Sequence, residues 1–128
     1  MEIPRELEGT EFDWFAVDEH GRFALFATAG FGPIPKSVLS AAASHNAIGI
    51  GLAVTGWGSN DVWQSYSRAG LFAYNWSALK GCYVRVAEPD APLTRELEAR
   101  LAACPGIPRL EVSFSQTAAI EPPWQDGT

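Results

Sequence analysis

Residues 13–35 read DWFAVDEHGRFALFATAGFGPIP, and this stretch decides the fold. Two apolar runs, Trp14 to Val17 and Phe23 to Ala27, flank a polar tetrapeptide at 18–21 that ends in glycine and suits a tight reversal. The pattern predicts a β-hairpin, with Asp18 stabilising the turn. Apolar side chains occupy successive positions in both runs, so both faces of each strand are apolar. This is typical of strands covered on both faces. The prolines and glycines of 29–35 cannot continue a central strand, so we expect a loop leading to a helix near Pro35.

The segment after the hairpin contains a helical region and then a stretch with two interpretations. Residues 36–46 carry apolar side chains on one side of a helix. Residues 47–56, AIGIGLAVTG, alternate large and small residues as a strand does, but a second buried helical segment fits equally, and we favour the helix. Residues 57–66 mix glycine, short polar residues and aromatics without periodicity, which predicts a long loop.

The second half of the chain contains a second hairpin, a helix and a strand. Residues 70–76 and 81–87 predict the hairpin, and leucines at helical spacing over 93–104 predict a helix that Thr94 caps. Alternation of Leu110, Val112 and Phe114 with polar residues predicts a last strand that is solvated on one face. The expected order is β-β-α-β-β-α-β. It indicates an α+β fold in one domain, residues 1–128, with a mainly antiparallel sheet of about five strands and helices on one face.

Composition excludes several classes of protein. Of the 128 residues, 47% are hydrophobic and 19% charged, which argues against disorder, and no apolar run approaches the roughly 20 residues that span a bilayer. The net charge of −6 repels a phosphate backbone, so we expect neither a nucleic-acid nor a membrane partner. The N-terminal residues lack the pattern of a secretory signal, and we expect a cytoplasmic protein in which Cys82 and Cys104 are buried, reduced thiols. The oligomeric state is left open.

Motifs that would carry chemistry fail on inspection. Gly51 and Gly56 have the spacing of a phosphate-binding loop, but Trp57-Gly58 stand where lysine and a hydroxyl residue are required. His20 and His45 have no neighbouring ligand spacing and are expected to be ordinary surface histidines. No local cation or helix start would activate Cys82. The sequence therefore indicates no catalytic residue, no metal site and no cofactor.

The aromatic-rich stretch after residue 56 contains the candidate site. Aromatic side chains among small polar residues can anchor a protein partner, and they can equally pack beneath a loop as part of the core. If they are exposed together, they form an aromatic patch with a polar edge, typical of protein-binding surfaces. The candidate binding residues are Trp57, Asn60, Asp61, Trp63 and Tyr66.

The hairpin sequence quoted above, followed by GLFAYNW and GCYVRVAEPDAPL, resembles a group of small uncharacterised bacterial proteins that share such a hairpin and a later tyrosine-containing strand before a proline-rich turn. The resemblance spans most of residues 13–93. In size, acidity and composition the chain is also similar to immunity proteins of bacterial toxin systems. That similarity implies an expected function, the neutralisation of a basic toxin by protein–protein contact, but it assigns no role to any residue.

Two hypotheses about function follow. In the first, the chain is a non-enzymatic binding protein whose acidic surface and aromatic residues block a partner such as a basic toxin. In the second, it is a small-ligand-binding protein or an enzyme with a pocket near residues 57–68, where Asp61, Tyr66 and Arg68 supply polar groups.

Overall fold

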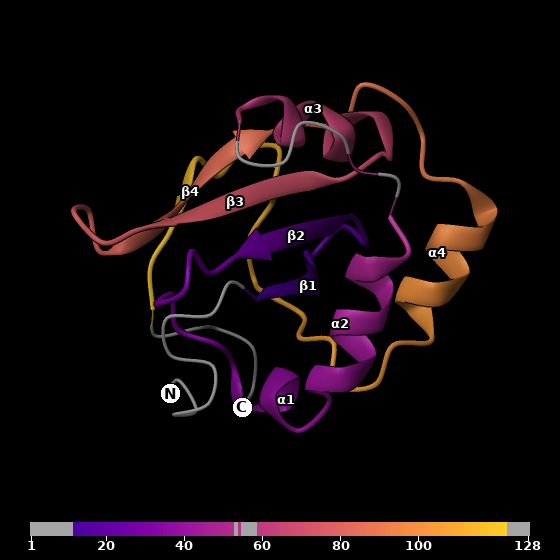
Figure 1. The fold of residues 1–128 in the computed structure, drawn as a ribbon, viewed down its shortest axis with the longest axis horizontal. Coiled ribbons are helices and arrows are strands. Elements are labelled where there is room, and N and C mark those ends of the chain that lie inside the picture. The colour runs from indigo at the N-terminus through magenta and orange to yellow at the C-terminus, as the bar shows by residue number, and fades with distance from the viewer. Residues whose placement is uncertain (1–11, 53, 55–58, 123–128) are drawn as a thin grey trace.

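The computed structural model of the protein describes residues 12–52, 54 and 59–122. Its centre is a five-stranded sheet in which the strands follow one another in chain order (Figure 1). Neighbouring strands are antiparallel except β2 and β3, which are parallel. The predicted α+β fold is confirmed. The strands are β1 (Asp13–Val17), β2 (Phe23–Ala27), β3 (Phe72–Ser77), β4 (Cys82–Ala87) and β5 (Ala119–Ile120).

Both predicted hairpins are present. In the first, Trp14 lies opposite Phe26 and Val17 opposite Phe23, and Gly21 takes the positive φ angle, 80°, that the reversal requires. In the second, Trp76 of β3 lies opposite Tyr83 of β4. The sequence leaves open how the two hairpins pair with each other. They pair through parallel strands because three helices occupy the long connection between β2 and β3, which allows a crossover instead of a hairpin return.

The helical region before residue 50 consists of two helices, α1 (Lys36–Leu39) and α2 (Ala42–Ile50). The helical interpretation of 47–56 is correct as far as Ile50, and the chain turns at Gly51 and Leu52. Residues 53 and 55–58 lie outside the described residues.

The loop predicted over 57–66 is wrong from Asp61 onward, since Asp61–Arg68 form helix α3. Just past the end of the helix, Gly70 has a φ of 90°; its N–H bonds the Ser67 carbonyl, and the N–H of Leu71 bonds the carbonyl of Tyr66. The prediction failed because glycine and short polar residues at 58–61 are typical of loops, although the buried residues of α3, Val62, Ser65 and Tyr66, follow helical spacing.

The helix predicted over 93–104 is present as α4 (Arg95–Ala102). Thr94 caps it as expected, because its side-chain oxygen accepts a 3.2 Å hydrogen bond from the N–H of Leu97. Leu97 and Leu101 lie on the side of the helix that faces the sheet, and both are buried there.

The strand predicted at 110–115 is wrong, and β5 lies further on, at Ala119–Ile120. Alternation correctly indicates which side chains are buried, because Leu110 and Phe114 are 2% and 0% exposed. The backbone does not form a ladder, however, since its groups bond the first hairpin irregularly: the N–H of Leu110 bonds the Val17 carbonyl, and the N–H of Phe114 bonds a side chain, Asp18. We call residues 108–118 the covering segment.

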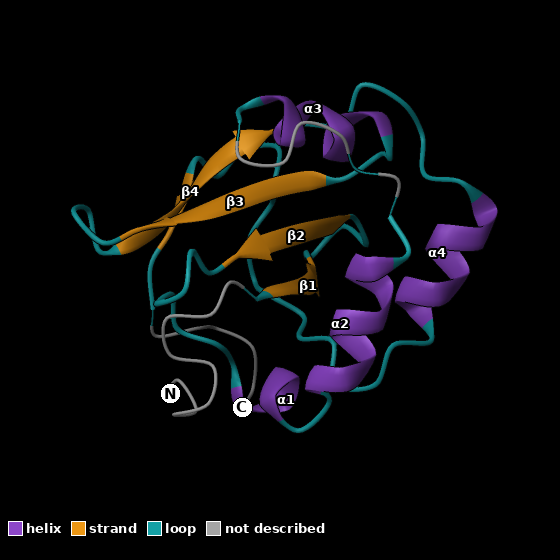
Figure 2. Ribbon diagram, in the orientation of Figure 1, coloured by secondary structure: helices purple, strands orange, loops and turns teal. Residues whose placement is uncertain are grey.

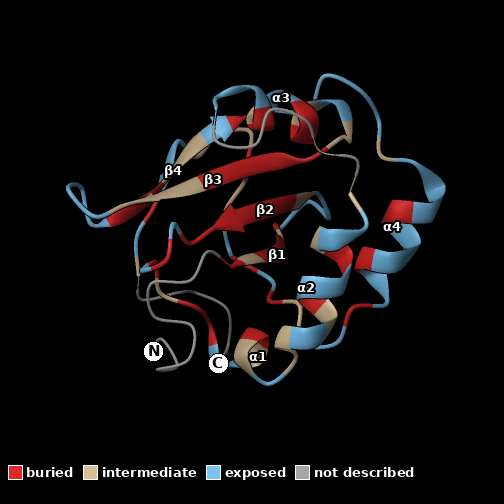
Figure 3. Cartoon of the chain, viewed as in Figure 1, coloured by how far each residue is buried: buried red, intermediate tan, exposed pale blue. Residues whose placement is uncertain are grey.

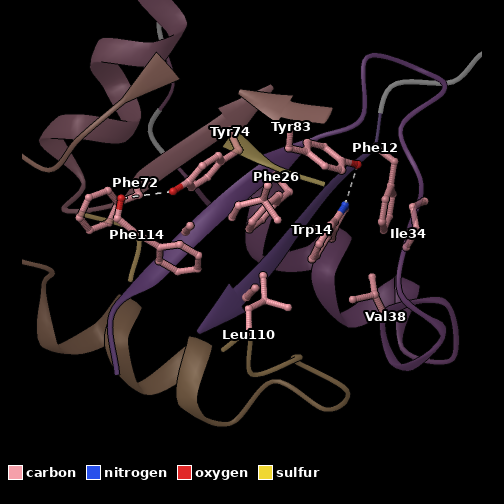
Figure 4. Packing of buried hydrophobic residues seen from close by; sticks show 13 residues of the cluster. Phe12, Trp14, Phe26, Ile34, Val38, Phe72, Tyr74, Tyr83, Leu110 and Phe114 are labelled. Carbon is pink, nitrogen blue, oxygen red and sulfur yellow. Dashed lines mark hydrogen bonds between the residues drawn. The ribbon is translucent and has the colours of Figure 1, made fainter. Parts of the chain in front are cut away.

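The two faces of the sheet are covered differently. Helices α2, α3 and α4 pack against one face, over Phe15, Leu25 and Ala73 (Figure 2). The other face carries a stacked aromatic cluster that α1, the loop before it and the covering segment close (Figure 4). Strand β2 is consequently buried along most of its length, and β3 is buried over its first half, Phe72 to Tyr74 (Figure 3). The cluster includes Trp14, Phe26, Tyr74, Tyr83 and Phe114.

Candidate functional site

Four of the five candidate binding residues lie at or on α3, and Trp57 lies outside the described residues. Asn60 and Asp61 are exposed at the start of the helix, and Trp63 is half-buried. Tyr66 is only 3% exposed and belongs to the core beneath the helix. The four residues are thus near neighbours on one helix, but they divide into an exposed polar pair, a half-buried ring and a core residue.

Trp63 and Tyr66 form the aromatic part of this surface. Their ring centroids are 5.9 Å apart with the planes tilted by 54°, and Trp63 packs against the buried cluster to which Tyr66 belongs. Three-residue spacing on a helix places the two rings side by side. Because Tyr66 is held in the core, it fixes the Trp63 ring, whose outer part remains accessible on the surface of α3.

Acidic side chains surround α3. Asp61 lies in the first turn, where the partial positive charge of the helix start favours a carboxylate. The loop after β4 reaches the other end of the helix, because the N–H of Asp90 donates a 3.0 Å hydrogen bond to the carbonyl of Ser67. Glu88 and Asp90 are both exposed there, together with Arg68.

The acidity of the whole chain is unevenly distributed. The described residues include ten acidic and eight basic side chains, so four of the six net negative charges belong to residues 1–11 and 123–128. A charged partner would therefore meet a nearly balanced folded surface, on which local groups such as those around α3 decide the contact.

The described residues form a depression of about 320 Å³ at the starts of β2 and β3. Its apolar wall includes Phe23, Phe72 and Leu93, and its charged residues are Arg22 and Glu98. Asp61, Tyr66 and Arg68, the groups of the pocket hypothesis, do not line this depression. Sequence reasoning missed this site because its residues come from the first turn, two strand starts and α4, which only the tertiary fold brings together.

The prediction that His45 is a surface residue is wrong, since it is 0% exposed. Its Nδ1 accepts a 3.1 Å hydrogen bond from the N–H of Phe15 on the outer edge of β1, and its ring stacks over the Phe15 ring. Nε2 is buried and has no partner with hydrogen-bond geometry among the described residues. Burial lowers the pKa of His45 to about 4, although the Gly106 backbone raises it by less. The imidazole is therefore neutral at pH 7, with its proton on Nε2.

The two tyrosine hydroxyls in the aromatic cluster bind backbone carbonyls. Tyr74 donates its hydroxyl to the carbonyls of Phe114 and Thr117, 3.2 and 2.6 Å away, and Tyr83 donates to that of Pro33, 3.0 Å away (Figure 4 shows the bond to Phe114). Burial raises the pKa of both tyrosines well above the ordinary phenol value. These hydroxyls hold the covering segment and the loop before α1, which is a structural use.

The described residues include few other side chains that could react or bind a metal ion. Cys82 and Cys104 are buried free thiols, and burial raises the pKa of Cys104, which disfavours the reactive thiolate. Within the part of the chain that the structure describes, no three His, Cys, Asp or Glu side chains gather where they could hold a metal ion. Over the same residues, no helix has the length and apolarity needed to cross a membrane.

Comparison of the chain with family models, with curated proteins and with solved structures finds no match.

Proposed function

We propose that this protein is a non-enzymatic binding protein, a bacterial immunity protein that acts in the cytoplasm and neutralises a basic toxin by protein–protein contact. The observation that carries the proposal is the surface of α3, where the half-buried Trp63 ring lies beside exposed Asn60 and Asp61. An aromatic anchor with a polar edge is the arrangement that concentrates binding energy at protein interfaces.

The rigidity of this surface supports the proposal. Trp63 contacts Tyr66, and Tyr66 is fixed in the core, so the exposed part of the Trp63 ring has little conformational freedom to lose when a partner covers it. Ordering side chains at an interface costs about 0.5–1.5 kcal/mol for each flexible residue, and a ring that is already held avoids most of that cost. Gly70 ends α3 sharply and keeps the helix in place above the sheet.

The charges near α3 supply the complementarity that a basic partner needs. Asp61 lies at one end of the helix, and Glu88 and Asp90 lie in the loop bonded to the other end. Three exposed carboxylates against Arg68 leave a local acidic excess. Such an excess raises the rate of association with a basic protein and makes it sensitive to salt.

The positions of the titratable groups favour binding over catalysis. His45 is enclosed and neutral with Nδ1 occupied, and the hydroxyls of Tyr74 and Tyr83 are donated to carbonyls inside the molecule. A general acid or base must reach the atom that it protonates or deprotonates. These three side chains instead join segments of the fold.

The proposal is tested with the protein encoded by the adjacent gene, purified and titrated into this protein in a calorimeter. Trp63→Ala should weaken binding by about 2 kcal/mol, because it removes the aromatic anchor. Asp61→Asn should reduce the dependence of affinity on salt concentration. Gln64→Ala, at an exposed position of the same helix, is the matched control and should leave the affinity unchanged.

Thermal unfolding of each variant separates binding from folding. If Trp63→Ala loses stability but binds as tightly per folded molecule, the ring is a core residue and the α3 surface is not the interface. If the adjacent gene product is basic and the wild-type protein does not bind it at all, the proposed immunity function is overturned.

A further inference from the structure

The depression at the starts of β2 and β3 has walls from five parts of the chain. The first turn supplies Arg22, the two strands supply Phe23 and Phe72, the loop after β4 supplies Leu93, and α4 supplies Glu98. Its volume of about 320 Å³ is at the lower end of the range for pockets that hold small molecules. It therefore has room for a compound of few atoms.

Two opposite charges line this depression without neutralising each other. The side chains of Arg22 and Glu98 make no hydrogen bond or ion pair with one another or with any other group among the described residues. Most of the remaining wall is apolar. A pocket with an apolar wall and two separate charges of opposite sign matches a ligand with the same three features.

The backbone around the depression is fixed in shape. Gly70 has a φ of 90°, and a Cβ placed on it would lie 2.5 Å from the backbone nitrogen of Leu93, so the loop after β4 packs directly on the glycine. Pro89 and Pro92 restrict the same loop. On the opposite side, the N–H of Arg22 donates a 2.9 Å hydrogen bond to Asp18, which fixes the turn. The site is consequently formed before any ligand arrives.

We propose that this depression binds a small zwitterion with an apolar body, such as a free amino acid with an apolar side chain. Arg22 receives its carboxylate, Glu98 receives its ammonium group, and the apolar part rests on Phe23 and Leu93. The site is separate from α3 and does not depend on the proposed protein partner.

The experiment titrates L-phenylalanine into the 15N-labelled full chain and follows the backbone amide signals. Two single-charge analogues are titrated in parallel: N-acetyl-L-phenylalanine, which keeps only the carboxylate, and L-phenylalaninamide, which keeps only the ammonium group. We expect saturable shifts at Arg22, Phe23, Gly70 and Leu93 with L-phenylalanine, and binding about two- to fivefold weaker for each analogue, because each loses one charge contact.

Variants assign the two charges. Arg22→Gln should weaken binding of L-phenylalanine and abolish that of N-acetyl-L-phenylalanine. Glu98→Gln should weaken L-phenylalanine but strengthen N-acetyl-L-phenylalanine, because it removes the repulsion between two carboxylates. Arg95→Gln, an exposed change on α4 outside the depression, is the control and should alter neither.

Three outcomes overturn the proposal. The first is the absence of saturable shifts at these residues with 20 mM L-phenylalanine. The second is equal binding of all three compounds, which indicates contact of the phenyl ring alone. The third is retention of wild-type affinity by both Arg22→Gln and Glu98→Gln.

Discussion

The backbone N–H of Phe114 donates a 2.9 Å hydrogen bond to Oδ2 of Asp18, ninety-six residues earlier in the chain. The other carboxylate oxygen, Oδ1, accepts from the N–H groups of His20 and Arg22 in the first turn, both at 2.9 Å. One fully buried side chain therefore closes the first hairpin and attaches the covering segment to it. Three N–H donors replace the water that the carboxylate loses on burial.

Asp18→Asn should destabilise the protein by about 2 kcal/mol or more, because an amide can present only one oxygen and its NH2 group faces an N–H donor. Chemical denaturation at pH 7 measures the loss. Glu111→Gln, an exposed change in the covering segment, is the control and should have an effect within about 0.5 kcal/mol. Equal stabilities of the two variants would show that Asp18 does not hold this segment.

Stability should fall with acid because of His45, whose folded pKa of about 4 lies below the unfolded value of 6.5. The unfolded chain binds the proton more readily, so stability decreases as pH falls from about 6.5 towards 4, by about 1 kcal/mol between pH 7.5 and 5.5. Burial is the larger cause of this pKa shift, and the Gly106 backbone opposes it by less.

The pH dependence is measured by denaturation at the two pH values, with two variants. His45→Gln should reduce the difference, because glutamine can accept the N–H of Phe15 but does not titrate. Asn46→Ala, an exposed change next to His45 that removes no titratable group, should retain the wild-type difference. An identical pH dependence in His45→Gln and the wild type would contradict the assignment.

Leu97→Asp should abolish cooperative unfolding or cost more than about 3 kcal/mol, because it removes a buried leucine and places a charge in the core under α4. The adjacent variant Glu98→Ala, on the exposed side, should change stability by no more than about 0.5 kcal/mol. Melting temperatures of the two proteins compare the faces of the helix directly. An unchanged melting temperature in Leu97→Asp would mean that α4 is misplaced.

Gly106→Ala should be far more harmful than Gly81→Ala, although both glycines have positive φ angles, 70° and 67°. A Cβ at Gly106 would lie 2.2 Å from the carbonyl oxygen of Ser37. Around a Cβ at Gly81, by contrast, no described atom outside the two neighbouring residues lies within 4 Å. Gly81→Ala should cost about 1 kcal/mol from the backbone alone, and Gly106→Ala at least about 2 kcal/mol more. Urea denaturation of both variants decides, and equal losses would refute the close packing of Gly106 on α1.

The two hairpins and α4 could be predicted from sequence because their signals are local. Apolar runs around Gly21, a threonine before the repeat of Leu97 and Leu101, and a proline-containing break after β4 each act within a few residues. The periods of 2.0 and 3.6 also identify which side chains are buried, even at Leu110 and Phe114, where the predicted strand is absent.

The tertiary structure alone decided the remaining features, because each depends on partners far away in sequence. The parallel pairing of β2 with β3 follows from helices in the connection, and the irregular path of the covering segment follows from the bond between Asp18 and Phe114. His45 has no local signal for burial, and its place is set by the N–H of Phe15 on β1. On α3, Val62 and Tyr66 follow helical spacing, but a helix of eight residues is formed mainly by its packing on the sheet, and this packing separates exposed Asp61 from buried Tyr66.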